Sequence, residues 1–152
     1  MYSGAEKNAD ASLTGWQQFS PQEWATRSVF TVKQDVRLLN EHVVRATLTE
    51  PLRELVKKYD LAGEKIDWFL PHISSKYFAE PVAAGVAAAG LNIPREKWFS
   101  SLFEKGNTGS AAPYIMLDEL FHSGRIKKGH KLLMHIPESG RFSSGFIFME
   151  AV

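Results

Sequence analysis

The chain has 152 residues, of which 44% are hydrophobic, and this is enough for one domain with a substantial core. Its 18 basic and 17 acidic residues give a formal net charge of +1 at pH 7, which argues against a basic tail that binds nucleic acid or a membrane surface. No stretch approaches the roughly 20 continuous apolar residues of a membrane span, and the first residues lack a signal-peptide pattern. The absence of cysteine excludes disulfides and any thiol nucleophile within these residues, and it fits a reducing cytoplasm, where we expect the protein.

Residues 1–28 are rich in Gly, Ser, Asn and Gln and show no sustained periodicity, so we interpret them as a linker or inter-half segment. Trp16, Phe19 and Trp24 are too many large aromatic residues for a solvated tail. We therefore expect this segment to pack against another part of the protein.

Apolar residues recur at helical spacing from Val36 to Tyr59, which predicts a long helical stretch. Pro51 lies inside this stretch and should divide or bend it, because proline lacks a backbone N–H. Thr49 is then the expected N-cap of the second helix.

The short apolar run "IDWFL", residues 66–70, has the pattern of a buried strand. The following stretch 74–90, "SSKYFAEPVAAGVAAAG", predicts a helix that is small and apolar nearly all round. Such a helix is expected to be buried on several sides, as it would be between two sheets. Pro81 should bend it, and Gly90 should end it.

Residues 97–103, "KWFSSLF", form a second strand candidate. After a turn, a helix is predicted from about Ala111 to Gly124, and its buried stripe would comprise Met116, Leu117, Leu120 and Phe121. Segments 130–137 and 145–152 are predicted to pair as an antiparallel hairpin. The whole pattern predicts a layered α/β domain with a mixed sheet, an Ala-rich buried helix and helices on the other face.

Two polar side chains follow the two strand candidates. His72 follows the run 66–70 after Pro71, and Asn107 follows the run 97–103. In open α/β sheets the carboxyl ends of strands face the crevice where ligands bind. An imidazole N–H and a carboxamide N–H make a donor pair suited to a developing oxyanion, and neither group needs to change charge. The pattern favours enolate or oxyanion stabilisation over general acid–base catalysis.

Structural interpretations stand beside these functional ones. His72 alone is more often a structural histidine, and Asn107 alone fits ordinary turn chemistry. No base and orienting group are evident near the serines, and the neighbouring hydroxyls are interpreted as helix caps: Ser74, Ser75, Thr108 and Ser110.

The remaining histidines and basic residues carry no predicted site. His130 and His135 should face opposite sides of their strand, so a shared metal is not expected. His42 and His122 are interpreted as helix-surface residues. A cluster of basic residues of this kind usually lies in a solvated turn; its members are Arg125, Lys127, Lys128 and Lys131. The sequence contains no phosphate-cradling glycine loop and no metal-ligand cluster, and we expect no cofactor.

Three stretches, "IDWFLPHISS", "GNTGSAAPYIMLDELFHSGRIKKGHKLLM" and "SGRFSSGFIFMEA", resemble the C-terminal half of 3-oxoacyl-[acyl-carrier-protein] synthase III. These thiolase-like condensing enzymes start fatty acid synthesis. The resemblance runs from about Val29 to the end and implies a C-terminal thiolase-like domain over residues 29–152. A full subunit of the family has two similar halves, with the nucleophilic cysteine in the first half and the histidine and asparagine in the second.

The resemblance implies that His72 and Asn107 are the catalytic pair. In the family they donate hydrogen bonds to the thioester carbonyl of a malonyl unit as carbon dioxide leaves, and the enolate attacks an acyl group carried on the cysteine. Because this chain has no cysteine, we interpret it as a C-terminal domain that is inactive alone. The implied partners are the acyl carrier protein, acyl and malonyl thioesters, the missing N-terminal half and a second subunit in a homodimer. The family's acidic carrier would dock on Arg and Lys side chains.

The sequence departs from the family pattern at two places, which are candidate substrate contacts. The family commonly has Gln-Ala-Asn where this chain has Ile73, Ser74 and Ser75, and the candidates here are Ile73 and Ser75. The family's glycine-rich loop is replaced by "PESGRFSSG", where Gly140, Arg141 and Phe142 are the candidates. Arg141 stands where a glycine is usual, and its bulk would narrow the acyl pocket or meet a charged substrate. These departures leave open a related acyltransferase that forms esters or amides, and a non-catalytic partner subunit of a condensing enzyme.

Overall fold

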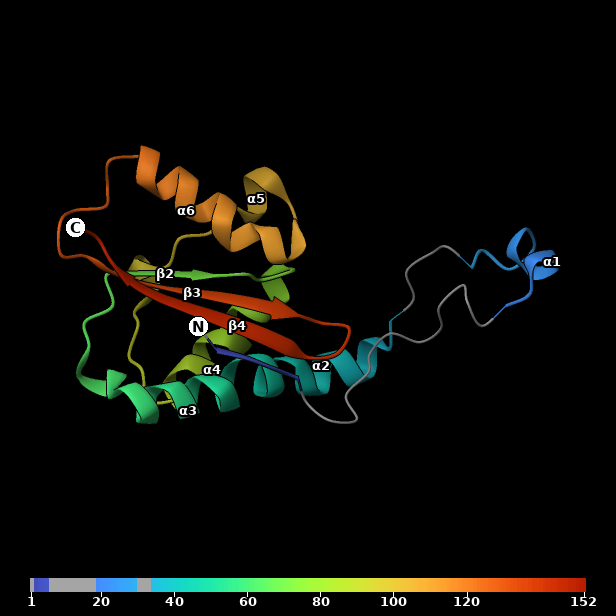
Figure 1. Cartoon of the computed structure of the whole chain (residues 1–152), viewed down its shortest axis with the longest axis horizontal. Coiled ribbons are helices and arrows are strands. Elements are labelled where there is room, and N and C mark those ends of the chain that lie inside the picture. Colours follow the sequence, from blue (N-terminus) through green and yellow to red (C-terminus); the bar gives the residue numbers. More distant parts are fainter. Residues whose placement is uncertain (1, 6–18, 30–33) are drawn as a thin grey trace.

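A mixed β-sheet forms the middle layer of the protein, with helices on both of its faces (Figure 1). The computed structural model describes residues 2–5, 19–29 and 34–152. Four strands lie in the order β1 (Tyr2–Ala5), β4 (Ser143–Glu150), β3 (Lys131–Glu138) and β2 (Trp68–Pro71). This arrangement confirms the predicted layered α/β domain.

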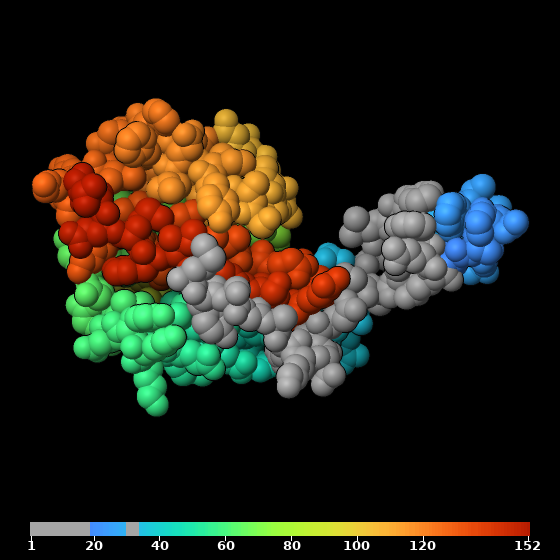
Figure 2. Space-filling model, viewed as in Figure 1, coloured from blue at the N-terminus to red at the C-terminus, as the bar shows by residue number. Residues whose placement is uncertain are grey.

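The two longest strands form the predicted hairpin. β3 and β4 pair antiparallel over their full length, from Lys131 opposite Glu150 to Glu138 opposite Ser143. β2 lies parallel to β3, and its four residues are all buried, which confirms the buried strand expected there. Red atoms of β4 stay in view between α6 (orange) and α3 (green) in the space-filling picture (Figure 2).

The predicted linker contains regular structure. Residues 2–5 form strand β1, which pairs antiparallel with β4, and Pro21–Trp24 form the short helix α1. An edge strand is held by backbone hydrogen bonds, so its sequence need not show a strong pattern, and the lack of periodicity did not reveal this strand. Trp16 lies outside the described residues, while the indole Nε1 of Trp24 donates to the carbonyl of Phe19 at 3.0 Å.

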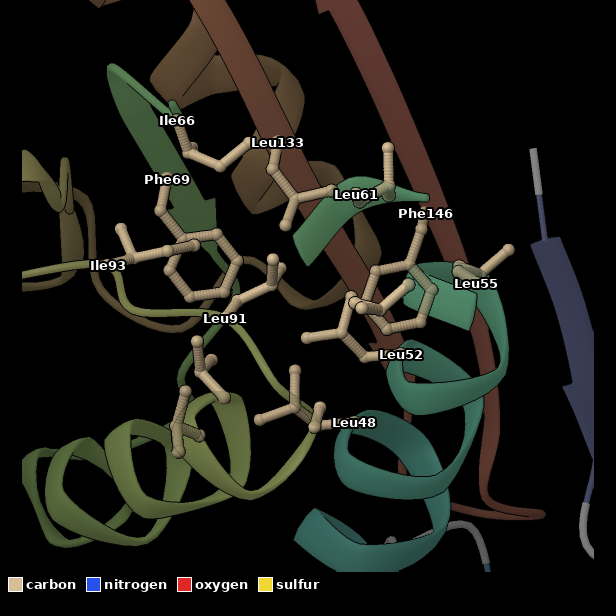
Figure 3. Close-up of a cluster of buried hydrophobic side chains, with 14 of the residues drawn as sticks. Leu48, Leu52, Leu55, Leu61, Ile66, Phe69, Leu91, Ile93, Leu133 and Phe146 are labelled. Carbon is tan, nitrogen blue, oxygen red and sulfur yellow. The ribbon is translucent and has the colours of Figure 1, made fainter. Parts of the chain in front are cut away.

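The two larger clusters of the core lie on opposite faces of the sheet, because β2 sends successive side chains to opposite faces. Phe69 packs with Leu133 of β3 and Phe146 of β4 on the side of α3 and α4, where Leu48 and Leu52 meet them (Figure 3). On the other face, β2 and β3 pack against α6, and this cluster comprises Trp68, Leu70, Ala112, Met116, Leu120, Leu132 and Met134. None of the helices in the described ranges is long and apolar enough to cross a lipid bilayer.

The stretch around Pro51 stays helical. Helix α2 (Val36–Val44) continues through a π-helical turn (Arg45–Thr49) into α3 (Glu50–Tyr59). The irregular turn lies just before the proline, which supplies no N–H to the preceding turn. The prediction of Thr49 as an N-cap was wrong, because the residue has helical backbone angles and its hydroxyl instead donates to the carbonyl of Val44 at 3.5 Å.

The Ala-rich helix α4 (Ala79–Ala88) is buried on one side. Gly85 faces the π-helical turn so closely that a Cβ there would lie 2.7 Å from Thr49 Oγ1. The opposite side is exposed at Ala84, Ala87 and Ala88, so burial on several sides is not observed. Within the described ranges, the chain supplies one sheet for this helix to cover, not two.

A proline near the start of α4 and a glycine after its end explain where this helix begins and stops. Pro81 is the third residue of the helix, where its missing N–H has no intrahelical acceptor, so the predicted bend is not needed. Gly90 ends the helix as predicted, with φ of +96°, and its N–H donates to the carbonyl of Ala87. The N–H of Leu91 donates to Val86, which completes a Schellman motif.

The prediction of a second strand at residues 97–103 was wrong. Its residues form the end of a 3-10 turn (Arg95–Lys97), one bridge from Trp98 to Phe69, and the start of helix α5 (Leu102–Lys105). The aromatic residues that favour a strand here anchor a loop, since the Trp98 ring packs edge-on against Phe69 with centroids 5.1 Å apart.

Helix α6 (Ala112–His122) follows the prediction closely. Met116 and Leu120 are buried and Leu117 is partly buried, but Phe121 is 66% exposed and does not belong to the buried stripe. Phe121 follows Leu120 by about 100° around the helix axis, which turns it away from the sheet. Gly124, with φ of +70°, lies just past the end of α6, where it was expected.

Candidate active site

A cavity of about 480 Å³ opens at the carboxyl ends of the parallel strands β2 and β3. His72 and Asn107 both line it, although they lie 35 positions apart in the sequence. Eight of the eighteen described residues that line the cavity are apolar: Leu39, Val43, Val44, Leu48, Ile73, Phe78, Val82 and Pro137. The cavity therefore combines apolar side chains with polar groups, as ligand pockets commonly do.

β2 positions His72. The backbone N–H of His72 donates to the carbonyl of His135 at 3.1 Å, which extends the pairing of β2 with β3 by one residue. The side chain is half-buried, and this burial lowers the pKa of the His72 imidazole below its usual value of 6.5. At neutral pH the ring is therefore uncharged and carries one N–H.

Two glycines and an Asx turn position Asn107. Gly106 and Gly109 both have positive φ angles, of +74° and +60°, which explains why glycine stands on either side of Asn107 and Thr108. The amide oxygen of Asn107 accepts a hydrogen bond from the backbone N–H of Gly109 at 3.1 Å. This bond uses the acceptor side of the amide and leaves the Nδ2 hydrogens for other contacts. Asn107 follows helix α5, not the strand expected before it.

The serine and threonine hydroxyls near His72 and Asn107 were expected to cap helices. Thr108 and Ser75 stand at the N-cap positions of short 3-10 turns, but neither side chain makes a capping hydrogen bond. The interpretation of these two as caps was wrong, and in the turn that contains Thr108 the Asn107 side chain makes the hydrogen bond instead. Ser74 and Ser110 line the cavity.

The structure also brings a second histidine to the cavity. His135 of β3 lines it, is 2% exposed, and stacks on the ring of Phe146 with centroids 4.9 Å apart. Its Nε2 donates to the carbonyl of Thr47 at 2.9 Å. Burial lowers the pKa of His135 to about 4. The sequence interpretation placed His135 only on the strand face opposite His130.

His130 lies in a different environment. Its Nδ1 accepts from the indole Nε1 of Trp68 and from the backbone N–H of Lys127, both at 3.3 Å. His42 and His122 are partly or largely exposed on α2 and α6, as predicted. Among residues 2–5, 19–29 and 34–152, no three His, Cys, Asp or Glu side chains cluster as a metal site would require.

The candidate substrate contacts from the sequence separate into two groups. Ile73 lines the cavity, whereas Ser75 does not. Gly140, Arg141 and Phe142 are also absent from the described lining. Arg141 is exposed, while the Phe142 side chain is fully buried against the cluster around Ala46.

The same loop instead presents Glu138 and Ser139 to the cavity. The Glu138 carboxylate accepts hydrogen bonds from the backbone N–H groups of Gly140 and Arg141, and from the hydroxyl of Ser143. An acidic residue two and three positions before N–H donors is typical of a side chain that organises a turn. The stretch "PESGRFSS" carries this signal in the sequence.

Two members of the basic cluster are held by contacts. Arg125 lies over the ring of Trp68, 4.4 Å from its centroid, and Lys131 forms an ion pair with Glu64. Lys127 and Lys128 are exposed.

Comparison with known proteins places these features in a family. Residues 56–145 match the family model described as 3-oxoacyl-[acyl-carrier-protein (ACP)] synthase III C terminal. The beta-ketoacyl-[acyl-carrier-protein] synthase III of Bradyrhizobium sp. is 29% identical over 116 residues, which is 76% of this chain and 34% of that protein. The protein of the same name from Prochlorococcus marinus is 40% identical over 78 residues, which is 51% of this chain and 22% of that protein.

Solved structures show the same fold. The crystal structure of 3-oxoacyl-[acyl-carrier-protein] synthase III from Aquifex aeolicus matches with a TM-score of 0.74 and 23% identity, and the match covers 98% of this chain and 42% of that one. The chain therefore has a thiolase-like fold, and it spans about a third or less of the length of the two curated relatives. Since the family model covers more than half of the chain, the chain belongs to the 3-oxoacyl-[acyl-carrier-protein] synthase III family and matches its C-terminal domain.

Proposed function

We propose that this chain is the half of a decarboxylating condensing enzyme that stabilises the enolate. In this proposal His72 and Asn107 donate hydrogen bonds to one thioester carbonyl oxygen of a malonyl group carried on acyl carrier protein. The supporting observation is that both side chains line the same cavity at the carboxyl ends of β2 and β3. The names of the relatives, beta-ketoacyl-[acyl-carrier-protein] synthase III, agree with this chemistry.

The state of each side chain suits the role. Burial keeps the His72 imidazole neutral at pH 7, so it donates an N–H without having to lose a proton during the reaction. The Asn107 amide is held through its oxygen by Gly109, which leaves Nδ2 as the donor. Fixed donors aimed at developing negative charge are typical of oxyanion sites.

The proposed reaction has two bond changes in the malonyl unit. The bond between the carboxylate and the α-carbon breaks, carbon dioxide leaves, and the electron pair becomes an enolate whose oxygen His72 and Asn107 stabilise. The α-carbon then attacks an acyl thioester carbonyl, and the thiolate of that thioester departs. Because the chain has no cysteine, the thiol that carries the acyl group belongs to another polypeptide segment. We propose an N-terminal half with that cysteine, and a homodimer of the complete enzyme, as partners.

A second candidate is a non-catalytic partner subunit, and the absence of cysteine is the observation that favours it. Such a subunit would shape the pocket of a true synthase without taking part in decarboxylation. The two candidates differ in what His72 and Asn107 do, so one experiment separates them.

The test measures carbon dioxide release from a labelled malonyl-carrier thioester by the native-length protein. We expect His72→Ala and Asn107→Ala each to lower the rate by about 10²- to 10³-fold, the usual cost of losing one oxyanion donor. The matched controls are His122→Ala, because the His122 side chain is 70% exposed on α6, and Asn92→Ala, an exposed loop residue. Full release by both site variants would reject the proposed role and favour the partner subunit.

A further inference from the structure

A buried nitrogen of the cavity-lining residue His135 has no hydrogen-bond partner. Its Nδ1 is shielded from solvent, and no described residue bonds to it. Most buried side-chain polar atoms in folded proteins have at least one partner, so an exception calls for an explanation. His135 shares the cavity with His72 and Asn107, which makes a ligand group the natural partner to consider.

The other ring nitrogen fixes the tautomer. In a regular α-helix the carbonyl of Thr47 would accept from the N–H four residues later, but that residue is Pro51, which has none. The Nε2 of His135 lies 2.9 Å from this carbonyl oxygen. A carbonyl oxygen can only accept, so the ring proton is on Nε2 and Nδ1 is a bare acceptor.

The ring is held in place by two contacts, the Nε2 bond to Thr47 and the stack on Phe146. It stacks on Phe146 with an interplanar angle of 24°, and its residue lies opposite Pro71 and Phe146 in the two strand pairings of β3. A rotation that offered Nδ1 to another donor would break the Nε2 bond to Thr47. The titratable neighbour is His72, and the residues that meet the ring from the π-helical turn and from β4 carry no charge.

We propose that His135 is a ligand-binding residue whose Nδ1 accepts a hydrogen bond from a hydroxyl group on the acyl chain of the ligand. The inference rests on the proposed function, because it assumes that the cavity receives an acyl thioester. A plain methylene chain or a carbonyl oxygen has no proton to give and leaves Nδ1 unpaired, whereas a hydroxyl satisfies it. Since Nδ1 is shielded from solvent, its donor belongs to the buried acyl chain and not to the carrier arm that leads back to solvent. Nδ1 is shielded in this conformation, so the hydroxyl reaches it when a side chain that lines the cavity changes rotamer.

The test compares binding of short acyl thioesters that differ by one hydroxyl. Butyryl-N-acetylcysteamine and its 2-, 3- and 4-hydroxy forms are titrated into the native-length protein. We expect one hydroxylated probe to bind about tenfold more tightly than the plain one, which is the size of one good neutral hydrogen bond. In ¹⁵N-histidine-labelled protein, the Nδ1 resonance of His135 shifts with that probe and not with butyryl-N-acetylcysteamine.

Two substitutions separate the role of Nδ1 from the role of Nε2. His135→Gln keeps an N–H donor near Nε2 for the Thr47 carbonyl but removes the acceptor at Nδ1, so the hydroxyl preference should disappear while the fold remains. His135→Asn keeps an oxygen acceptor near Nδ1 and loses the Thr47 bond, so part of the preference should survive in a less stable protein. If neither variant folds, the wild-type affinities and the ¹⁵N shift still decide the question.

The outcomes separate this inference from the function on which it rests. Equal binding of all four probes by the wild type, or an unchanged preference in His135→Gln, overturns the role of His135 and leaves the role of the cavity intact. A donor that is a trapped water or a carrier-arm amide produces the same equality and overturns it too. Failure of every probe to bind would contradict both the role of His135 and the proposal that the cavity binds acyl groups.

Discussion

Replacing His135 by glutamine should change how the stability of the protein depends on pH. Burial lowers the pKa of His135 from 6.5 to about 4, so between these values the unfolded chain binds a proton that the folded chain does not. Stability is therefore fully present above about pH 6.5 and falls as the pH drops toward 4. His135→Gln removes the titrating group and keeps a donor for the Thr47 carbonyl.

The size of the effect follows from the displaced pKa. One pKa unit corresponds to about 1.4 kcal/mol, so the difference of roughly 2.5 units amounts to about 3 kcal/mol at pH 4. Against a total stability of about 5–15 kcal/mol for a typical domain, this loss is easily measured. Burial also lowers the pKa of His72, which contributes in the same direction in both proteins and cancels in the comparison.

The assay is urea-induced unfolding of the wild type and His135→Gln at pH 7.5, 6, 5 and 4. We expect the free energy of unfolding of the wild type to fall by about 3 kcal/mol more than that of the variant between the first and last of these values. As a matched control, Asn92→Gln in an exposed loop removes no titrating group and should keep the pH profile of the wild type. Parallel pH profiles for the wild type and His135→Gln would refute the claim that His135 is buried and neutral.

Three further predictions concern other parts of the chain. Asn107→Asp keeps an oxygen for the Gly109 N–H but replaces the donor by a negative charge, so carbon dioxide release should fall by at least about 10²-fold with little change in thermal unfolding. Gly85→Ala puts a Cβ 2.7 Å from Thr49 Oγ1 and should cost about 1–2 kcal/mol in a denaturant titration, while unchanged stability would contradict the close packing of α4 on the π-helical turn. The isolated chain should self-associate, since Phe103 and Phe121 are 78% and 66% exposed, and a strictly monomeric profile in sedimentation at high concentration would contradict this.

Local patterns predicted the parts of the fold that depend on local causes. The hairpin of β3 and β4 and the buried strand β2 follow from short apolar runs with turn residues between them. The same reasoning failed for residues 97–103, because Trp98 and Phe99 are β-forming residues that serve a loop. Their partner is Phe69, which Trp98 contacts edge-on and whose carbonyl accepts from the Phe99 N–H.

The candidate site was likewise predictable where a local pattern determines a residue's position, and not where a distant contact does. Asn107 was identified from the glycines around it, and the structure supplies the reason in the positive φ angles of Gly106 and Gly109. His135 was not identified, because its partner Thr47 lies 88 positions away and only the folded chain brings them together. Pro51 gave a usable signal, since a proline inside a helix frees the carbonyl four residues earlier for another donor.

The proposal that His72 and Asn107 donate to one carbonyl oxygen is tested most directly by a crystal structure of the native-length protein with a non-hydrolysable malonyl thioester analogue. The account predicts that an imidazole nitrogen of His72 and Nδ2 of Asn107 both lie about 2.7–3.2 Å from the thioester carbonyl oxygen of the analogue. An analogue seated in the cavity with that oxygen beyond the reach of either nitrogen would contradict it.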